Sequence, residues 1–554
     1  MSDDSEFLNI LNTELNNQEN FQSTPDIKPK LISKPILPIN STLPISKPIP
    51  TSQPILTSQP IKPISNFEYD YILIGGGPTS LTLAWYLAQQ KKKVLIIEKE
   101  KELGGCHRVQ RIDGLFTEHG PRVYSDSYIN FTNLLKEMDL DYDKIFTPYT
   151  FDLTNIGTKK KTDLSLYERF CLGLGILALT FNSEYGKQTS ILEYMKWFSF
   201  KEETIDYIDR IVRLSDGATA ERYTVFQFLQ LANQQFLYSL HQPRLPTDQG
   251  LVKLWQEKLI KTGFVKIKVN HEVTVINKNK ENEIDNIVVL DRSNLNQSEV
   301  KGGKYIITVP PKPLVKLLRN SKVENAFGNI NELQKWSEQN SYFDYLPITL
   351  HWNYVVDLPK IQGLPLSEWG VAFIILTNYM KFEGSLEEKQ NSKTVISTCI
   401  TFPERKSSFI NKTAHESSLL DIKTEVIRQL RTVIPNLPIP TKMLLSPQVY
   451  RDEKNKRWVN IDTAYVLTNE NAHISAESKI YKNLYNCGSH NGKSKYYYTS
   501  LESAVSNALS LANVLEPKIN KPLQETAQIS VYINRLIILA VVGLIAWYYY
   551  KTRY

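Results

Sequence analysis

The 554-residue sequence contains few cysteines and no strong excess of charge of either sign. Its four cysteines, Cys106, Cys171, Cys399 and Cys487, stand far apart and form no metal-ligand pattern. Such spacing predicts free thiols in a reducing compartment and no disulfide framework. The net charge is only +7, and basic and acidic residues are interspersed. We therefore expect no nucleic-acid partner.

The N-terminal region lacks the pattern of a secretory signal peptide, because its first residues, Met-Ser-Asp-Asp-Ser-Glu-Phe, are acidic. Residues 1–66 instead repeat Pro with Ile, Lys, Ser and Thr, and the run Thr51-Ser-Gln-Pro-Ile recurs from Thr57. Such a tract cannot bury a core and favours polyproline II. The sequence predicts a disordered Pro-rich arm, which is either a flexible spacer or a docking arm for a protein partner.

One stretch has the pattern of a strand, a glycine turn and a helix that binds a dinucleotide. Tyr71–Ile74 is a short, apolar, β-prone run, Gly75 and Gly77 follow it, and a helical apolar stripe begins at Leu81. Gly75 would form the tight turn, and Gly77 would let bare backbone approach a pyrophosphate at the helix N-terminus. Ser80 takes the place of the third glycine and is small enough for close helix–strand packing.

A second predicted strand, Val94–Ile97, ends at Glu98, which is 21 residues after Gly77. An acid at that spacing binds the ribose hydroxyls in Rossmann-type domains. Strand, turn, helix, strand and acid in register therefore predict dinucleotide binding. The alternative is a glycine-rich turn in an ordinary βαβ unit.

Further motifs extend this pattern along the chain. Together with the first stretch they resemble the flavin amine oxidase superfamily, which includes monoamine and polyamine oxidases, protoporphyrinogen oxidase and the phytoene desaturases. The resemblance covers roughly residues 67–516. The motifs are the glycine pair Gly104-Gly105 with Arg108, the run Gly114–Tyr124, the stretch Lys482–Gly492 and the helix Thr499–Ala508.

The resemblance implies a non-covalently bound FAD. Where the family links flavin to a cysteine, that residue lies well upstream of the position of Cys487, so we expect no covalent bond. The helix from Leu501 would aim its positive end at the flavin. Besides Gly75, Gly77, Ser80 and Glu98, the residues implied at the cofactor are Gly104, Gly105, Arg108, Gly120, Val273, Gly488, Glu502 and Val505.

The sequence departs from the amine oxidase pattern at several positions. Cys106 stands where the family has an Arg, and Ser500 stands where an aromatic residue forms one wall of a cage. Pro-Ile-Thr at 347–349 replaces a Lys that holds a water near the flavin in many amine oxidases. These departures weaken an amine oxidase assignment, and no catalytic residue is assigned. His119 and Arg122 either face the substrate or stabilise their loop.

The resemblance implies an α/β fold in which a Rossmann-type FAD-binding domain is interrupted by a mixed helical and sheet substrate domain. The apolar helix Cys171–Phe181 is too short to span a bilayer. It is predicted to be either a wall of a lipophilic substrate channel or a buried core helix. The expected segments are the arm 1–66, the FAD-binding parts 67–145, 246–320 and 456–516, the substrate-domain parts 146–245 and 321–455, a linker 517–530 and a transmembrane helix 531–550.

Residues 531–550 are predominantly apolar, and the segment is long enough to span a bilayer. Arg535 can snorkel to one interface, and Trp547–Tyr550 with Lys551 resemble an interfacial belt. We predict a single-pass tail anchor that holds the catalytic domain on the cytosolic side of a membrane. The alternative is a buried C-terminal helix.

The predicted function is therefore a membrane-anchored FAD-dependent oxidoreductase. A small-molecule substrate, either an amine or a lipophilic compound, would transfer a hydride to flavin N5. Because no second glycine fingerprint for NAD(P)H occurs, oxygen or a membrane electron acceptor would reoxidise the flavin. The alternatives are a flavin-dependent sugar-nucleotide mutase, which is an isomerase, and a flavoprotein scaffold with little activity.

Overall fold

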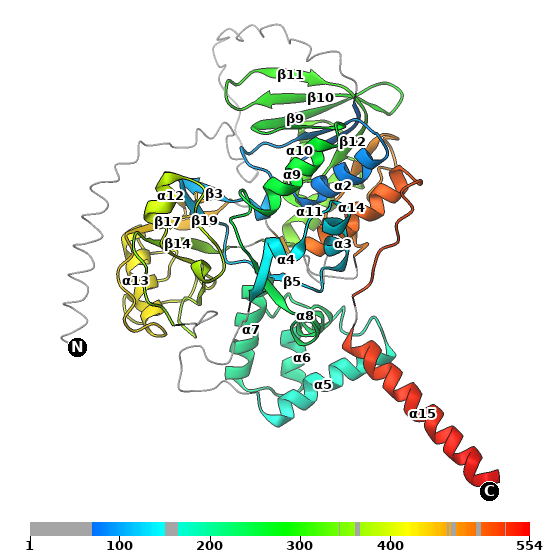
Figure 1. The fold of residues 1–554 in the computed structure, drawn as a ribbon, viewed down its shortest axis with the longest axis vertical. Helices are drawn as coiled ribbons and strands as arrows, with labels where there is room; N and C mark the ends of the chain where they lie inside the picture. Colours follow the sequence, from blue (N-terminus) through cyan, green and yellow to red (C-terminus); the bar gives the residue numbers. More distant parts are fainter. Residues whose placement is uncertain are drawn as a thin grey trace, which may run out of the picture. The chain divides into compact units, whose positions relative to one another are not determined.

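A five-stranded parallel sheet forms the centre of one half of the fold (Figure 1). Each pair of neighbouring strands is parallel. The strands are short and apolar because both faces of the sheet are covered, and all four residues of β2 are buried. The predicted α/β class with a Rossmann-type unit is confirmed. The strand order is β21 (Leu484–Asn486), β12 (Gly302–Ile307), β1 (Tyr69–Ile74), β2 (Val94–Ile97) and β8 (Val265–Lys268).

The computed structural model describes residues 69–149, 164–342, 344–359, 366–461, 465–466, 473–494, 500–526 and 528–553. The predicted Pro-rich arm, residues 1–66, lies outside the described residues.

Helices cover one face of the parallel sheet, and a second sheet covers the other. One core joins the sheet to a group of helices, of which α14 contacts both α2 and α3. The other core joins it to a three-stranded antiparallel sheet and two helices. The first group is α2 (Pro78–Gln89), α3 (Ile129–Glu137), α9 (Leu251–Lys261) and α14 (Leu501–Leu515), and the second is β9 (His271–Lys278), β10 (Ile284–Asp291), β11 (Gln297–Val300), α10 (Pro311–Asn320) and α11 (Ile330–Gln339).

A buried antiparallel sheet and a group of helices form the other half. Every residue of β14, β15 and β16 is buried. Capping boxes fix the starts of α5, α6 and α8, because Ser or Thr at the N-cap pairs with Glu or Gln three residues later. The sheet order is β15 (Val371–Ile375), β16 (Thr394–Ile400), β14 (Leu346–Trp352) and β17 (Lys442–Leu445), and the helices are α5 (Leu166–Phe181), α6 (Ile191–Trp197), α7 (Glu202–Asp216), α8 (Val225–Leu237) and α13 (Leu419–Arg431).

Short elements connect the two halves. They include the hairpin β3–β4 and the three-stranded sheet β5-β7-β6. Their bounds are β3 (Gln110–Ile112), β4 (Leu115–Thr117), β5 (Tyr124–Ser125), α4 (Tyr142–Ile145), β6 (Phe146–Tyr149), β7 (Leu240–Pro243), β13 (Ser341–Tyr342), α12 (Leu386–Asn391), β18 (Val449–Asp452), β19 (Arg457–Asn460) and β20 (Tyr465–Val466).

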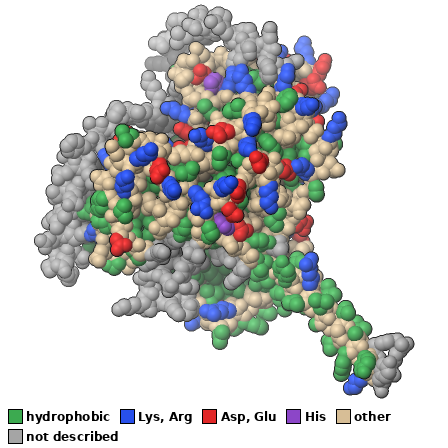
Figure 2. All heavy atoms as spheres, in the orientation of Figure 1, with side chains coloured by type: hydrophobic (Ala, Val, Ile, Leu, Met, Phe, Trp, Pro, Cys, Tyr) green, Lys and Arg blue, Asp and Glu red, His purple; other side chains and the backbone are tan. Residues whose placement is uncertain are grey.

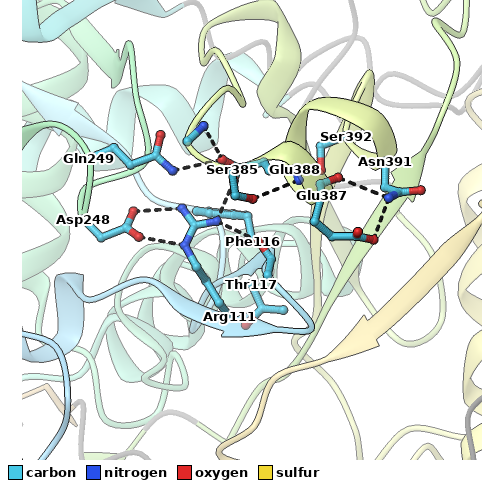
Figure 3. Close-up of polar contacts among 12 residues, drawn as sticks. Arg111, Phe116, Thr117, Asp248, Gln249, Ser385, Glu387, Glu388, Asn391 and Ser392 are labelled. Atoms are coloured by element: carbon cyan, nitrogen blue, oxygen red, sulfur yellow. Dashed lines mark hydrogen bonds and ion pairs between the residues drawn. The ribbon is translucent and has the colours of Figure 1, made fainter.

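A largely buried ion network joins these elements (Figure 3). Arg111 on β3 donates from Nε and Nη2 to Asp248 at 2.8 and 3.2 Å. Its Nη1 donates to Glu388 Oε1 on α12 at 2.7 Å. Glu388 is fully buried and also accepts from the side-chain amide of Gln249. The network therefore ties the loop before α9 to the second half of the fold.

The C-terminal segment is held against the body before its last helix begins. The backbone N–H of Gln524 donates to Asn130 Oδ1 at 2.9 Å, and Thr526 Oγ1 donates to the carbonyl of Ser127 at 3.0 Å. Helix α15 (Ile529–Arg553) then projects away from the rest of the fold (Figure 1). Its apolar side chains are largely exposed. Within the described residues, Ile529–Tyr548 is long and apolar enough to cross a membrane.

The structure corrects the expectation for the apolar helix Cys171–Phe181. Only Glu168, Cys171 and Gly175 of α5 are buried, so it is not a core helix. None of its residues lines the large cavity described below, so it is not a wall of that cavity either. Periodicity predicted the helix but not its exposure, because its outward and inward faces are both apolar.

We predict that Arg111→Met lowers the free energy of unfolding by about 3 kcal/mol or more, because it leaves the buried Glu388 carboxylate without its cation. Chemical denaturation of the detergent-solubilised full chain, followed by tryptophan fluorescence, measures this change. The control is Lys301→Met, which removes an exposed ion pair with Asp285. It should cost less than about 1 kcal/mol. If the two substitutions lower the free energy of unfolding by the same amount, the Arg111 network stabilises the fold no more than an exposed ion pair does.

Candidate functional site

A cavity of about 700 Å³ lies at the carboxyl ends of β1, β2 and β12 and extends to the antiparallel sheet. Ligands in open α/β sheets bind outside the carboxyl ends of the strands. The volume is within the range of roughly 300–1,000 Å³ that is typical of ligand and cofactor sites. Both halves of the fold supply its walls, so their mutual arrangement sets its shape.

The first glycine turn places backbone on the cavity wall. Gly75 has φ +115° and donates its N–H to the carbonyl of Ile97 at 2.8 Å. Gly77 is the N-cap of α2, which has no side-chain cap and no acid in its first turn. The start of α2 therefore presents backbone N–H groups and a partial positive charge at the cavity, as an anion site requires.

The second glycine turn packs directly on the first. The N–H of Gly104 donates to the carbonyl of Gly76 at 2.8 Å. Gly105 has φ +55°, and a Cβ added to it would lie 3.0 Å from the Gly77 Cα. A larger residue at 105 would separate the two turns. Gly105 lines the cavity, whereas Gly104 supports it from behind.

Ser80 stands behind the cavity and fastens α2 to the end of β12. Its hydroxyl shares a 2.6 Å hydrogen bond with Thr308 Oγ1, which donates to the carbonyl of Ile74 at 2.9 Å. Thr308 also lies 2.9 Å from the position of a Cβ added to Gly75. The sequence reasoning missed Thr308, although it directly follows the apolar run of β12.

Glu98 is buried at the end of β2 and lines the cavity. Its two oxygens accept hydrogen bonds from the N–H groups of Gly76 at 2.6 Å and Glu100 at 2.8 Å. Burial raises the pKa of Glu98, and these two backbone bonds oppose the rise. The carboxylate is thus held rigidly at the position where the sequence predicted a ribose contact.

Val273 on β9 and Arg108 lie on the wall as well. Arg108 Nη1 donates to the carbonyl of Gly105 at 2.9 Å, which ties the arginine to the second glycine turn. Lys312 and Lys316 on α10 face the same cavity and were not singled out in the sequence. Burial lowers the pKa of Lys312, whose Nζ lies 3.7 Å from the centroid of the Tyr342 ring.

At the other end, the cavity meets Gly120, Gly488 and the first turn of α14. The N–H of Gly488 donates to Asn491 Oδ1 at 2.7 Å. A Cβ at Gly488 would lie 2.6 Å from the His490 ring, so glycine is needed to seat that ring. His119 and Arg122 both line the cavity, as the interpretation that they face a substrate requires.

Two predicted cofactor residues on α14, Glu502 and Val505, lie away from the cavity lining. Glu502 is buried, and its oxygens accept from the N–H groups of Asn130 and Phe131, each at 3.0 Å. The Asn130 side-chain amide donates to it at 2.6 Å. Glu502 therefore satisfies buried N–H groups at the start of α3 that have no partner within the helix. The residues of α14 that line the cavity, with its N-cap, are Ser500, Leu501 and Ala504.

A small cavity of about 10 Å³ shares His107, Arg108 and Arg122 with the large one. Glu118 lines only the small cavity and is buried. Burial raises the pKa of Glu118 to about 7, although Arg122 opposes the rise. The sequence placed Glu118 in a family-like run, but nothing in the sequence reveals its burial.

The walls nearest the second half of the fold are largely apolar, although Ser215 on α7 and Gln234 on α8 also line them. They come from α7, α8, β7 and β15, and Cys399 on β16 joins them. Residues 347–349, where many amine oxidases have a Lys, lie in β14 outside the lining. The apolar side chains are Ile211, Leu214, Leu231, Leu240, Phe373 and Ile374.

The site and fold together define a Rossmann-type dinucleotide-binding unit joined to an apolar chamber. Residues 73–138 match the family model of the NAD(P)-binding Rossmann-like domain. Short stretches also match two curated proteins. One is thiamine thiazole synthase of Desulfosudis oleivorans, with 43% identity over 44 residues, and the other is UDP-galactopyranose mutase of Mycoplasma pneumoniae, with 37% identity over 60 residues. These matches cover 8% and 10% of this chain, but only 17% and 15% of the two relatives.

Solved structures match over most of the chain. Cyclohexylamine oxidase from Brevibacterium oxydans has a TM-score of 0.55 at 10% identity and is matched over its whole length, against 82% of this chain. Putrescine oxidase bound to putrescine has a TM-score of 0.53 at 13% identity, covering 81% of this chain and 99% of that protein. An oxidoreductase from Methanosarcina mazei has a TM-score of 0.53 at 14% identity, covering 80% and 99%. The chain therefore shares the fold of these proteins, as the resemblance implied.

We predict that Glu118 makes stability depend on pH. Its pKa is about 7 in the folded chain against 4.5 for an ordinary glutamate, so the folded chain binds this proton more tightly. The resulting stability is fully present below pH 4.5 and is lost as the pH rises through about 7, by about 3 kcal/mol. Chemical denaturation at pH 5 and pH 8 should show a smaller loss in Glu118→Gln than in the unaltered chain.

The control is Glu281→Gln, in the exposed turn between β9 and β10. It should keep the pH dependence of the unaltered chain. If Glu118→Gln also keeps it, the burial of a protonated Glu118 is refuted.

Proposed function

We propose that the protein is an FAD-dependent oxidoreductase that binds FAD non-covalently. The observation that carries this proposal is the continuous cavity, which joins the two glycine turns to an apolar chamber in the second half of the fold. A dinucleotide site alone would end at the parallel sheet. Here the cavity continues, so a bound dinucleotide and a second molecule can meet inside it.

The residues of the cavity fit FAD. The uncapped start of α2 suits the pyrophosphate, because its N–H groups have no side-chain acceptor. Glu98 is fixed where a ribose hydroxyl would bind, and Val273 would border the adenine. A Cβ on Gly105 would lie 3.0 Å from the Gly77 Cα, so a larger residue there would crowd the turn at which the phosphates would bind.

FAD supplies the chemistry of hydride acceptance at its flavin ring. The protein would contribute position, electrostatics and exclusion of water. The N-terminal end of α14, at Ser500 and Leu501, lies at the cavity, where its partial positive charge would favour negative charge on a reduced flavin, although Glu502 in the same turn offsets part of it. The apolar walls around Phe373 and Leu231 would exclude water from the bound substrate.

The substrate we propose is lipophilic rather than a small charged amine. The chamber walls are largely apolar, and β14 has no lysine in the position where many amine oxidases hold a water. An amine is the alternative substrate, because putrescine oxidase and cyclohexylamine oxidase are structurally similar to this chain. Oxygen or a membrane electron acceptor would take the electrons from the reduced flavin.

We also propose that α15 anchors the protein in a membrane as a single-pass tail, with the catalytic part on the cytosolic side. The apolar span Ile529–Tyr548 is exposed along its length and has no buried share. A helix of that length suffices to cross the hydrocarbon core. Exposing so large an apolar surface to water is unfavourable, so this surface supports a helix that lies in a bilayer.

A sugar-nucleotide mutase is the second candidate function. The match to UDP-galactopyranose mutase over 60 residues supports it. A mutase would need cationic groups for the substrate diphosphate, and Arg122 is a cationic residue on the wall, next to Gly120 and Pro121. The apolar chamber argues against it. A flavoprotein scaffold with little activity is the third possibility.

An absorption spectrum of the purified full chain in detergent tests the proposal. We expect flavin bands, and acid precipitation should release free FAD into the supernatant. Anaerobic bleaching of these bands by polyprenoids would support a lipophilic substrate, bleaching by amines would favour an amine oxidase, and turnover of UDP-sugars by reduced enzyme would favour the mutase. Protein that is colourless and takes up no FAD on titration would overturn the proposal.

We predict that Gly105→Val lowers FAD affinity at least tenfold, because its Cβ would separate the two glycine turns and its φ of +55° disfavours a β-branched residue. Fluorescence titration with FAD measures the affinity. The control is Gly173→Ala in α5, where nothing lies within 4 Å of the added Cβ. Unchanged affinity in Gly105→Val would contradict the phosphate site.

A further inference from the structure

Helix α5 presents an apolar stripe to the outside of the fold. Leu166, Phe170, Leu177 and Phe181 are 85%, 63%, 40% and 73% exposed. Their spacing of four, seven and four residues places them on one helical face. Figure 2 shows hydrophobic side chains in this region and along the C-terminal helix. A stripe of this kind on a protein surface marks an interaction site.

Charged groups flank the stripe but do not interrupt it. No charged residue occurs from Phe170 to Phe181. Arg169 lies in the first turn of α5, and an ion pair between Lys187 and Glu184 lies just beyond the last turn. The opposite face is seated in the fold, since Cys171 and Gly175 are buried. The helix therefore has one apolar face toward the core and another toward the surroundings.

Helix α15 lies beside α5, and its starting point is fixed (Figure 1). The N–H of Ile529 donates to Asn233 Oδ1 on α8 at 2.7 Å. The preceding segment is tied to the body through Gln524 and Thr526. A membrane span that starts at a fixed point must bring the surface around that point to the bilayer, and α5 is part of that surface.

We propose that α5 is a second membrane-contact element, which lies along the bilayer interface with its stripe in the acyl-chain region. This inference rests on the proposed anchoring by α15. At 16 residues, α5 is about 24 Å long, which is too short to span but suits an interfacial helix. The partner is a lipid surface, because the stripe is continuous with the span rather than placed elsewhere on the fold. The protein is thereby held in one orientation instead of swinging on its tail.

Photolabelling from within the bilayer tests this inference with the unaltered full chain. The protein is reconstituted into phosphatidylcholine liposomes that contain a lipid with a diazirine in its acyl chain, irradiated, digested and analysed by mass spectrometry. We expect lipid adducts on peptides from Leu166–Phe181 and from Ile529–Tyr548. Peptides around Ile260, which is 52% exposed on α9, should carry none.

The outcomes separate the two proposals. Adducts on α15 without adducts on α5 would overturn the inference about α5 and leave the anchor intact. The absence of adducts on α15 would overturn the anchor itself. In a second sample treated with a bifunctional cross-linker, links between the α5 helices of two chains, together with no lipid adducts on α5, would assign the stripe to self-association and also overturn the inference.

A double variant, Leu177→Glu with Phe181→Glu, provides a matched comparison. We expect labelling of α5 to fall at least fivefold while labelling of α15 stays unchanged. The control variant Ile260→Glu should leave both unchanged. Retained labelling of α5 in the double variant would count against the stripe as the surface that meets the lipid.

Discussion

The backbone contact between the two glycine turns is the constraint on which the site depends. Gly104 and Gly105 pack onto Gly76 and Gly77 so closely that a Cβ on Gly105 would lie 3.0 Å from the Gly77 Cα. Through this contact, the loop that follows β2 passes over the N-terminal end of α2. Because the glycines have no side chains, the cavity wall at this corner includes exposed backbone N–H groups beside the carboxylate of Glu98, which suit phosphates and a ribose.

The cavity also depends on how the two halves of the fold are joined. The Arg111 network links β3 and the loop before α9 to α12 through fully or largely buried charges. His351 on β14 adds a link, because its Nε2 lies 2.9 Å from the carbonyl of Phe116 on β4. Burial lowers the pKa of His351 to about 4, so the ring is neutral at ordinary pH and this link is unaffected by physiological pH changes. These contacts fix the chamber opposite the glycine turns.

Sequence reasoning performed best where local patterns are strong. The strand Val94–Ile97 begins and ends where its apolar, β-branched run predicted. The glycine turns and Glu98 came together at the carboxyl ends of the strands, since a strand–turn–helix pattern has one common folding outcome. Reasoning from the family was weaker at Glu502, which caps α3 instead of lining the cavity. Glu502 is at the predicted helix start, but the element that packs beside that start is set by the tertiary structure.

By itself, the sequence determined the α/β class, the nucleotide-binding turn, the acid after β2 and the apolar C-terminal helix, because each depends on residues close together in the chain. Only the tertiary structure decided that Glu118 is buried beside Arg122, that Thr308 fastens Ser80 to β12, and that one face of α5 remains outside. Those outcomes depend on contacts between segments far apart in sequence. A residue's exposure and pKa follow from what packs against it, and no local pattern of residue types specifies that.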